Sequence, residues 1–165
     1  MDISERAPLS MAEGWEGILG GGGRLRLETA DLPEFFPKQR WFGGKSEGIQ
    51  ATRIRDSVML NSQHSALTLV EVRSNSGRTD TYLLPLAIAL DRRGEELQRN
   101  APRAVIAPIL SGSAAGLLYD GIFDDQTCAR LFSLIEKGEE LEMHHGAARG
   151  NRSSVYDLSE RAPRN

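Results

Sequence analysis

The sequence predicts an α+β fold in which an antiparallel meander of strands has helices at its margins. Two observations lead to this prediction. Between residues 49 and 90 apolar residues recur at every second position, which is typical of half-buried antiparallel strands joined by hairpins. Helical patterns stand before and after the strand-rich stretches, whereas a parallel sheet would alternate strands with helices. The length of 165 residues suits one domain with its own core.

Residues 1–23 are expected to form a flexible leader. It ends in four consecutive glycines at residues 20–23, which cost backbone entropy and support no regular structure, so a linker or loop is predicted there. Within the leader, residues 11–19 fit a short helical turn that packs Trp15 and Ile18.

The first firm helical pattern covers residues 25–36. Asp31 and Glu34 have the spacing of a capping box, and Pro37 is expected to stop the helix because its ring cannot continue the hydrogen-bond ladder. A dense segment follows, and its seven residues are Gln39, Arg40, Trp41, Phe42, Gly43, Gly44 and Lys45. Its two glycines permit positive φ angles. Two interpretations stay open: the rings form an aromatic plug under the sheet with Arg40 stacked or salt-bridged, or they form a fixed surface that faces another domain.

Residues 49–90 are predicted to form a three-stranded meander. Between residues 66 and 73 two leucines fall on one face and two valines on the other, and between 81 and 90 five large apolar residues share one face. Residues 75–77 have turn chemistry. Pro85 donates no hydrogen bond, which suggests an edge or a bulge at that point.

The last third of the chain adds a hairpin and a helix. Residues 91–103 are polar and are expected on the surface, and residues 104–110 and 116–123 fit a hairpin around residues 111–113. A helix is predicted from Asp124 or Asp125 to about Lys137, with Gly138 as its C-cap. Cys128 lies on the apolar stripe of this helix and is expected in the core.

Several motifs imitate known sites without completing them. Residues 43–46 resemble the end of a phosphate-binding loop, but Gln39 stands where that loop needs glycine and no strand precedes it. A turn that exposes Lys45 is the better interpretation. His144 and His145 lie among glutamates, yet adjacent histidines rarely reach one metal ion, so a solvated surface is expected.

Composition excludes several classes of partner. The formal net charge of -3 gives no electrostatic reason to expect nucleic acid or an anionic membrane as a partner. The single cysteine cannot form an internal disulfide, which indicates a reducing, cytoplasmic compartment. No stretch reaches the ~20 apolar residues that a membrane span requires.

Four ordered segments resemble the N-terminal cap domain of maltokinases, which occur alone or fused behind trehalose synthase. The most specific segment is residues 36–45, Phe-Pro-Lys-Gln-Arg-Trp-Phe-Gly-Gly-Lys, preceded by Leu32 and Pro33. Residues 82–86 resemble the Tyr-x-x-Pro-Leu strand of the cap, and residues 119–125 resemble its segment leading into a helix. The leader around residues 15–19 also resembles the start of this region. The resemblance covers residues 15–140.

This resemblance implies a curved antiparallel sheet wrapped on a helix, likened to cystatin folds. It implies residues 24–148 as the cap and residues 149–165 as the start of a truncated kinase lobe or a disordered tail. The resemblance also implies that the cap packs on a kinase domain. That kinase phosphorylates maltose to maltose 1-phosphate with ATP and Mg²⁺, in α-glucan synthesis. The implied partners are the kinase catalytic lobe of the same protein and trehalose synthase. Residues 39–45 are then the interdomain signature.

The tail departs from the family pattern. Residues 153–156 match the end of a serine-rich loop that enters the nucleotide lobe, which makes Ser153 and Ser154 candidates for a phosphate-facing loop, but residues 149–152 do not match its start. None of the three histidines is followed two residues later by aspartate, as the catalytic loop of this kinase superfamily requires. We therefore expect no catalysis and no cofactor for this chain itself.

Two alternative hypotheses stay open. In the first, the chain is a stand-alone binding module that uses its curved sheet as the binding surface, a hypothesis that rests on fold analogy alone. In the second, it is the cap of a glucosamine kinase, since those enzymes have similar caps.

Overall fold

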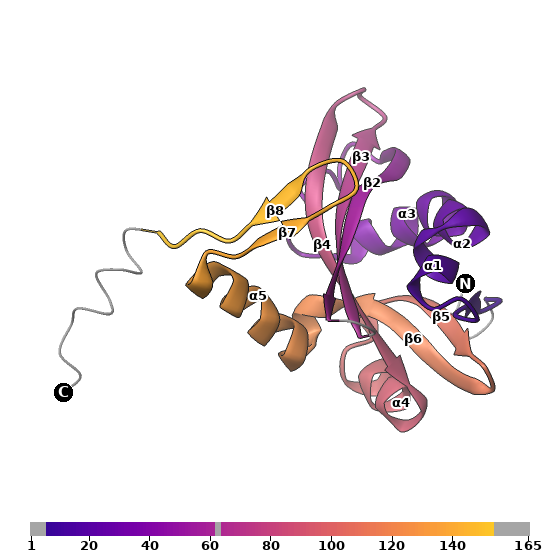
Figure 1. Ribbon diagram of the computed structural model, residues 1–165. Coiled ribbons are helices and arrows are strands. Elements are labelled where there is room, and N and C mark those ends of the chain that lie inside the picture. Colours follow the sequence, from indigo (N-terminus) through magenta and orange to yellow (C-terminus); the bar gives the residue numbers. More distant parts are fainter. Residues whose placement is uncertain (1–5, 62–63, 154–165) are drawn as a thin grey trace.

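The computed structural model describes residues 6–61 and 64–153. A curled six-stranded sheet in the order β1-β5-β6-β4-β3-β2 forms the centre of the molecule (Figure 1). All neighbouring strands are antiparallel except β1 (Leu9–Ser10), which runs parallel to β5. The α+β prediction with a curved sheet packed on a helix is confirmed.

The predicted meander consists of β2 (Ile49–Asn61), β3 (Ser65–Ser74) and β4 (Thr79–Leu90). Its pairing is antiparallel throughout, with Val70 opposite Tyr82 between β3 and β4. Alternation places side chains as the sequence predicts: Val70 and Val72 face the main core, while Leu67 faces the opposite side of the sheet.

The predicted hairpin is formed by β5 (Val105–Ser111) and β6 (Ala114–Asp120), and β6 adds to the meander beside β4. The β4–β6 pairing runs from Leu86 to Leu90, opposite residues 116–120. Pro85 therefore lies just outside this pairing, on a stretch of β4 that pairs with β3. The expectation of an edge position at this proline is confirmed for that side of the strand.

The N-terminal helices form an almost continuous path before the meander. They are α1 (Trp15–Leu19), α2 (Gly21–Arg26), the π-helical turn η2 (Leu27–Asp31), α3 (Leu32–Phe35) and the 3₁₀ turn η3 (Phe36–Lys38). The predicted turn that buries Trp15 and Ile18 is confirmed in α1. The α-helix ends at Phe35, before Pro37, as expected from the missing N–H of proline.

Two expectations in this region were wrong. The glycine run begins α2 instead of forming a loop: a Cβ on Gly23 would lie 2.0 Å from the carbonyl oxygen of Gly17, so the close packing of α1 on α2 requires glycine. Asp31 does not cap a helix. It is buried inside the helical path, and its carboxylate pairs with Arg6 at 3.1 Å and with Arg26 at 3.1 Å.

Two further helices flank the sheet. The polar stretch after β4 forms α4 (Asp91–Asn100), a helix that the sequence analysis missed, followed by the 3₁₀ turn η4 (Pro102–Ala104). The predicted C-terminal helix is α5 (Asp125–Lys137), which follows the 3₁₀ turn η5 (Gly121–Phe123). Asp124 caps α5 and Gly138 ends it in the left-handed conformation, so both capping predictions are confirmed.

A small hairpin of β7 (Glu140–Glu142) and β8 (Ala147–Arg149) follows α5 and lies over the sheet (Figure 1). The Asp56 carboxylate on β2 accepts the backbone N–H groups of His144 at 2.9 Å and His145 at 2.8 Å in the hairpin turn. Burial alone would raise the pKa of Asp56, but these amides outweigh it and the pKa lies below the ordinary value. After β8, Gly150 packs so closely that a Cβ there would lie 2.1 Å from the carbonyl oxygen of Leu134.

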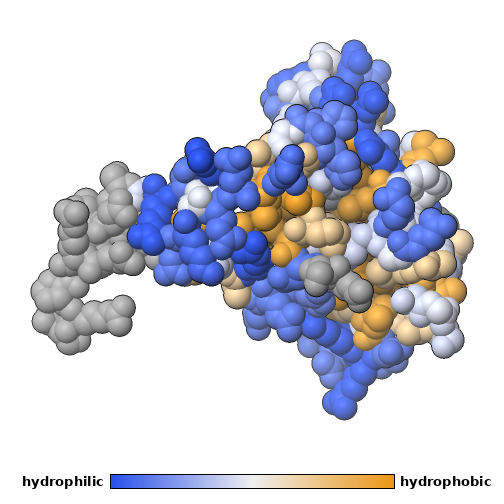
Figure 2. All heavy atoms as spheres, viewed as in Figure 1, coloured by the Kyte–Doolittle hydropathy of each residue, from blue (hydrophilic) through white to orange (hydrophobic). Residues whose placement is uncertain are grey.

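Both faces of the sheet are covered. One carries the main core under the N-terminal helices, and its largest buried members include Phe35, Phe36, Leu84, Leu86 and Leu118. The other packs Leu67 and Leu60 against Leu134 of α5, with the small hairpin over them. On the side seen in Figure 2, hydrophilic residues cover α5 and α4, while apolar residues reach the surface over the middle of the sheet.

The long edge strand β2 is partly shielded by the N-terminal helices. Glu28 accepts the backbone N–H of Ile54 at 2.8 Å, and Arg24, which is paired with Glu28 at 2.9 Å, donates to the carbonyl oxygen of Ile54. These side chains occupy backbone groups that an added strand would use.

Within the described residues, no helix is both long and apolar enough to cross a membrane, and the longest, α5, has 13 residues. No group of three or more metal-ligating side chains occurs in the same residues. The side chains of His144 and His145 are 75% and 79% exposed, as expected for a solvated surface. The boundaries predicted at residues 23 and 148 stay predictions.

Candidate interdomain surface

The predicted signature, residues 39–45, forms a loop between η3 and β2, and Gln39 anchors its start. This side chain is 5% exposed, and its Nε2 donates to the carbonyl oxygens of Phe35 at 3.2 Å and Arg103 at 2.9 Å. The loop is thereby fixed to the helix before it and to η4. Lys45 is exposed in a turn, as expected, and the element directly before the loop is η3 and not a strand.

Phe36 lies at the centre of an aromatic cluster. Its ring centroid lies 5.2 Å from that of Tyr82, 5.4 Å from that of Phe42 and 5.6 Å from that of Trp41. Tilted and edge-on contacts at these distances are favourable for aromatic pairs. Burial raises the pKa of Tyr82 above its ordinary value, with Asp80 adding to the shift and a hydrogen bond from the Gly43 backbone opposing it.

The two adjacent rings of the loop have different positions. Phe42 is 4% exposed and belongs to the main core, whereas Trp41 is 47% exposed. Phe42 is therefore the plug, whereas Trp41 lies at the surface, and the hypothesis that this surface faces another domain stays a prediction.

The glycines of the loop act differently from the expectation, since neither has a positive φ angle. A Cβ on Gly44 would lie 2.8 Å from the tip of the Phe42 ring, while Gly43 has open space. Gly44 thus permits the plug to fold back under the loop, and the reason for a glycine there is close packing.

Trp41 borders other exposed apolar residues. It lines a cavity of about 300 Å³ together with Leu83, which is 58% exposed, and Ile122, which is 56% exposed. Ile122 adjoins α5, because its carbonyl oxygen lies 3.2 Å from the Sγ of Cys128. From Cys128 the same helix face continues to two more exposed apolar residues, Phe132 and Ile135. We call Trp41, Leu83, Ile122, Phe132 and Ile135 the Trp41 face.

Cys128 itself departs from the expectation of a core residue. It is half-buried at the margin of the Trp41 face. Burial raises the pKa of its thiol, and Asp124 adds to this effect. The apolar stripe of α5 is therefore split, since Leu134 packs inward while Phe132 and Ile135 remain exposed.

Cationic residues flank Trp41 along the chain. Lys38, Arg40 and Lys45 are exposed, and so is Arg103, whose carbonyl oxygen binds Gln39. No ion pair between residues of the described ranges includes any of the four. The sequence alone did not indicate that these four basic residues lack ion pairs. Acidic residues lie close to the other basic clusters of the sequence, which suggested paired surface charges throughout.

The buried carboxylate of Asp124 positions the η5–α5 junction, which carries Ile122. Its Oδ2 accepts the backbone N–H of Thr127 at 2.8 Å and the Thr127 hydroxyl at 2.7 Å, and lies 3.0 Å from the Nε2 of His64. Its Oδ1 accepts the Tyr119 hydroxyl at 3.1 Å and a guanidinium N–H of Arg93. Burial would raise the pKa of Asp124, but the Thr127 hydrogen bonds and the charge of His64 hold it below the ordinary value.

The other candidate residues lie elsewhere. Ser153 is exposed and has no regular secondary structure, and Ser154 lies outside the described residues. The phosphate-loop hypothesis for this pair stays a prediction.

The Trp41 face, with its cationic border, thus lies on a curled α+β domain. The sequence profile of the maltokinase N-terminal cap domain matches residues 35–124, more than half of the chain, and the chain belongs to this family. The match begins at the aromatic cluster and ends at Asp124. A search of curated proteins found no match.

Proposed function

We propose that this chain is the non-catalytic cap of a maltokinase-like sugar kinase and that it docks on the kinase catalytic lobe through the Trp41 face. The parent enzyme would transfer phosphate from ATP, with Mg²⁺, to maltose and give maltose 1-phosphate. Family membership supports the class of parent.

The observation that carries the docking proposal is the half-exposed Trp41 on a buried aromatic base. Phe36 and Tyr82 hold the indole from behind, so little conformational entropy is lost when a partner covers its free side. Tryptophan is among the residues most often found at the energetic centre of interfaces. Leu83 and Ile122 supply apolar area around it.

The cationic border adds a preference for the partner. Arg40 and Lys45 belong to the signature loop, Lys38 precedes it and Arg103 contacts it, and none of the four has an ion pair in the described structure. Charges at the border of an interface mainly steer association and set its salt dependence. The docking surface of the kinase lobe should therefore be apolar at its centre and acidic at its border.

The test measures binding between this chain and a maltokinase catalytic lobe produced without its own cap, by calorimetry. Trp41→Ser should weaken binding by about tenfold or more, as expected for a hot-spot tryptophan. Leu25→Ser is the matched control, because Leu25 is 62% exposed on α2 and does not line the Trp41 cavity. Higher salt should slow association.

Equal effects of the two substitutions, or no binding, would overturn the docking proposal. Turnover of maltose or glucosamine with ATP by the 165-residue chain alone would refute its non-catalytic role. Binding to a glucosamine kinase lobe in preference would assign the cap to that enzyme, and glycan binding without any kinase lobe would favour a stand-alone module.

A further inference from the structure

A second cavity, away from the Trp41 face, has the composition of a ligand site. Its volume is about 810 Å³, within the range of small-molecule pockets. Segments far apart in the chain enclose it: the start of α1, the end of β2, the turn before β3, the end of β4, and α4. Its lining residues differ from those of the Trp41 cavity.

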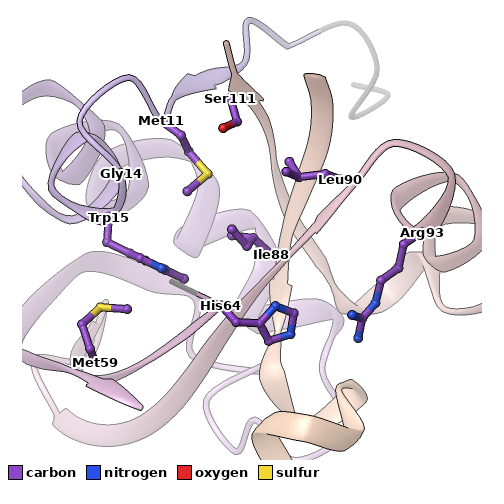
Figure 3. A pocket seen from close by; sticks show the side chains of 9 residues that line it. All are labelled: Met11, Gly14, Trp15, Met59, His64, Ile88, Leu90, Arg93 and Ser111. Carbon is purple, nitrogen blue, oxygen red and sulfur yellow. The ribbon is translucent and has the colours of Figure 1, made fainter. Parts of the chain in front are cut away.

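One side of this cavity is apolar, and the other carries the basic side chains of Arg93 and His64 (Figure 3). Trp15, Met11, Met59 and Ile88 gather on the apolar side, while His64 and Arg93 point toward one another across from them. Methionine and tryptophan side chains adapt well to flat apolar groups. Among the described residues, no acidic side chain lines the cavity.

Asp124, which bonds to both Arg93 and His64, has no hydrogen-bond acceptor capacity left. It is 1% exposed, and its two oxygens already have five donors from Thr127, Tyr119, Arg93 and His64. A carboxylate offers about four lone-pair sites, so one donor is in excess.

Arg93 retains donors for a ligand. Its side chain is 50% exposed, and its guanidinium has five N–H groups, more than Asp124 and the neighbouring Tyr119 hydroxyl can accept. Asp124 fixes the orientation of the guanidinium, so an anion that enters the cavity meets a donor held in place.

We propose that this cavity binds a small amphipathic organic anion. Its flat apolar part lies against Trp15 and the methionines, and its carboxylate, sulfonate or phosphate group lies at Arg93 and His64. Such a ligand would bridge α1, α4 and the turn before β3, three segments that lie far apart in the sequence. This site is independent of the docking proposal.

The test uses two fluorescent probes that share one ring system, anilinonaphthalene sulfonate and neutral phenylnaphthylamine. The sulfonate should bind about tenfold more tightly than the neutral probe, because a charge-assisted hydrogen bond is formed by it alone. Arg93→Gln should remove this advantage and leave the neutral probe unaffected. Arg92→Gln is the matched control, because the Arg92 side chain is 89% exposed and pairs with Glu96 on the same helix.

A second variant avoids the ion pair with Asp124. Ser111 lines the cavity, and Ser111→Phe should narrow it and weaken both probes. In a Trp41→Phe background Trp15 is the sole tryptophan, and its emission should fall as either probe binds. Circular dichroism checks that each variant folds; if Arg93→Gln does not, the two-probe comparison and Ser111→Phe decide. Equal affinity for the two probes, equal effects of the two arginine substitutions, or full binding by Ser111→Phe would overturn the proposal.

Discussion

Replacement of Asp124 by alanine should be among the most destabilising single changes in this domain. The variant loses the N-cap of α5, which costs about 1 kcal/mol. It also leaves the buried Tyr119 and Thr127 hydroxyls without their acceptor, at about 1–3 kcal/mol for a buried group. Because Arg93 and His64 are partly exposed, water compensates much of their loss. The total is about 4 kcal/mol, a large part of the ~5–15 kcal/mol stability of a small domain.

Two further variants separate the contributions. Asp124→Asn keeps one oxygen, which can still cap α5 at Thr127, but its NH2 group replaces the oxygen that accepts from Tyr119 and Arg93, so it should cost about 1–3 kcal/mol and less than alanine. Asp125→Ala removes the next carboxylate, which is exposed in the first turn of α5 and contributes only through the helix dipole, at most about 1 kcal/mol. Urea unfolding followed by circular dichroism gives all three values if the slope with denaturant is unchanged. If Asp124→Ala costs no more than Asp125→Ala, the central role of Asp124 is refuted.

Substitutions at four other positions test the remaining fold arguments. Phe42→Ala should cost about 3–5 kcal/mol in urea unfolding because it empties a buried site, and Trp41→Ala should cost less because its ring is half-exposed. Glu28→Ala should uncover the N–H of Ile54 and promote concentration-dependent association in light scattering, while Glu28→Gln, which keeps an acceptor, should not. Burial raises the pKa of Asp120, so the stability that its protonated form contributes is lost as the pH rises through the folded pKa. The neutral variant Asp120→Asn should therefore have a higher melting temperature than wild type at neutral pH. This difference should disappear in acid, where Asp120 is protonated in both the folded and the unfolded state. An unchanged melting temperature at neutral pH would contradict this.

The parts of the fold that follow from local pattern could be predicted. The meander was predictable because alternation along β3 and β4 reflects two differently covered faces of the sheet. The start and end of α5 were predictable because Asp124 and Gly138 perform local capping roles.

The parts that depend on distant neighbours could not be predicted. Helix α4 has no apolar stripe, and Gly94 within it argues against a helix; a Cβ there would lie 3.1 Å from the carbonyl oxygen of Ala89, so packing on the sheet explains this glycine. Asp31 has the spacing of a cap, but its partners Arg6 and Arg26 were not visible as such in the sequence. The two-residue strand β1 carries too little pattern to indicate a parallel pairing.

The position of the candidate site in the sequence could be predicted, but not which of its side chains are buried and which are exposed. The signature loop stood out through its adjacent rings, yet which ring is buried depends on Phe36 and Tyr82. The apolar residues on η5 and α5 that join Trp41 were not predicted as part of the surface, because Ile135 and Cys128 fit an inward-facing helix stripe equally well.

The attachment of the β7–β8 hairpin has a mechanical consequence. Asp56 holds the hairpin at its turn and Gly150 is pressed against α5 at its end, so the hairpin is fixed at two points. A force applied to the residues directly after β8 is therefore transmitted to β2 and α5, because no flexible linker lies between them and the hairpin. A displacement of residues 150–153 would therefore strain β2 and α5 together.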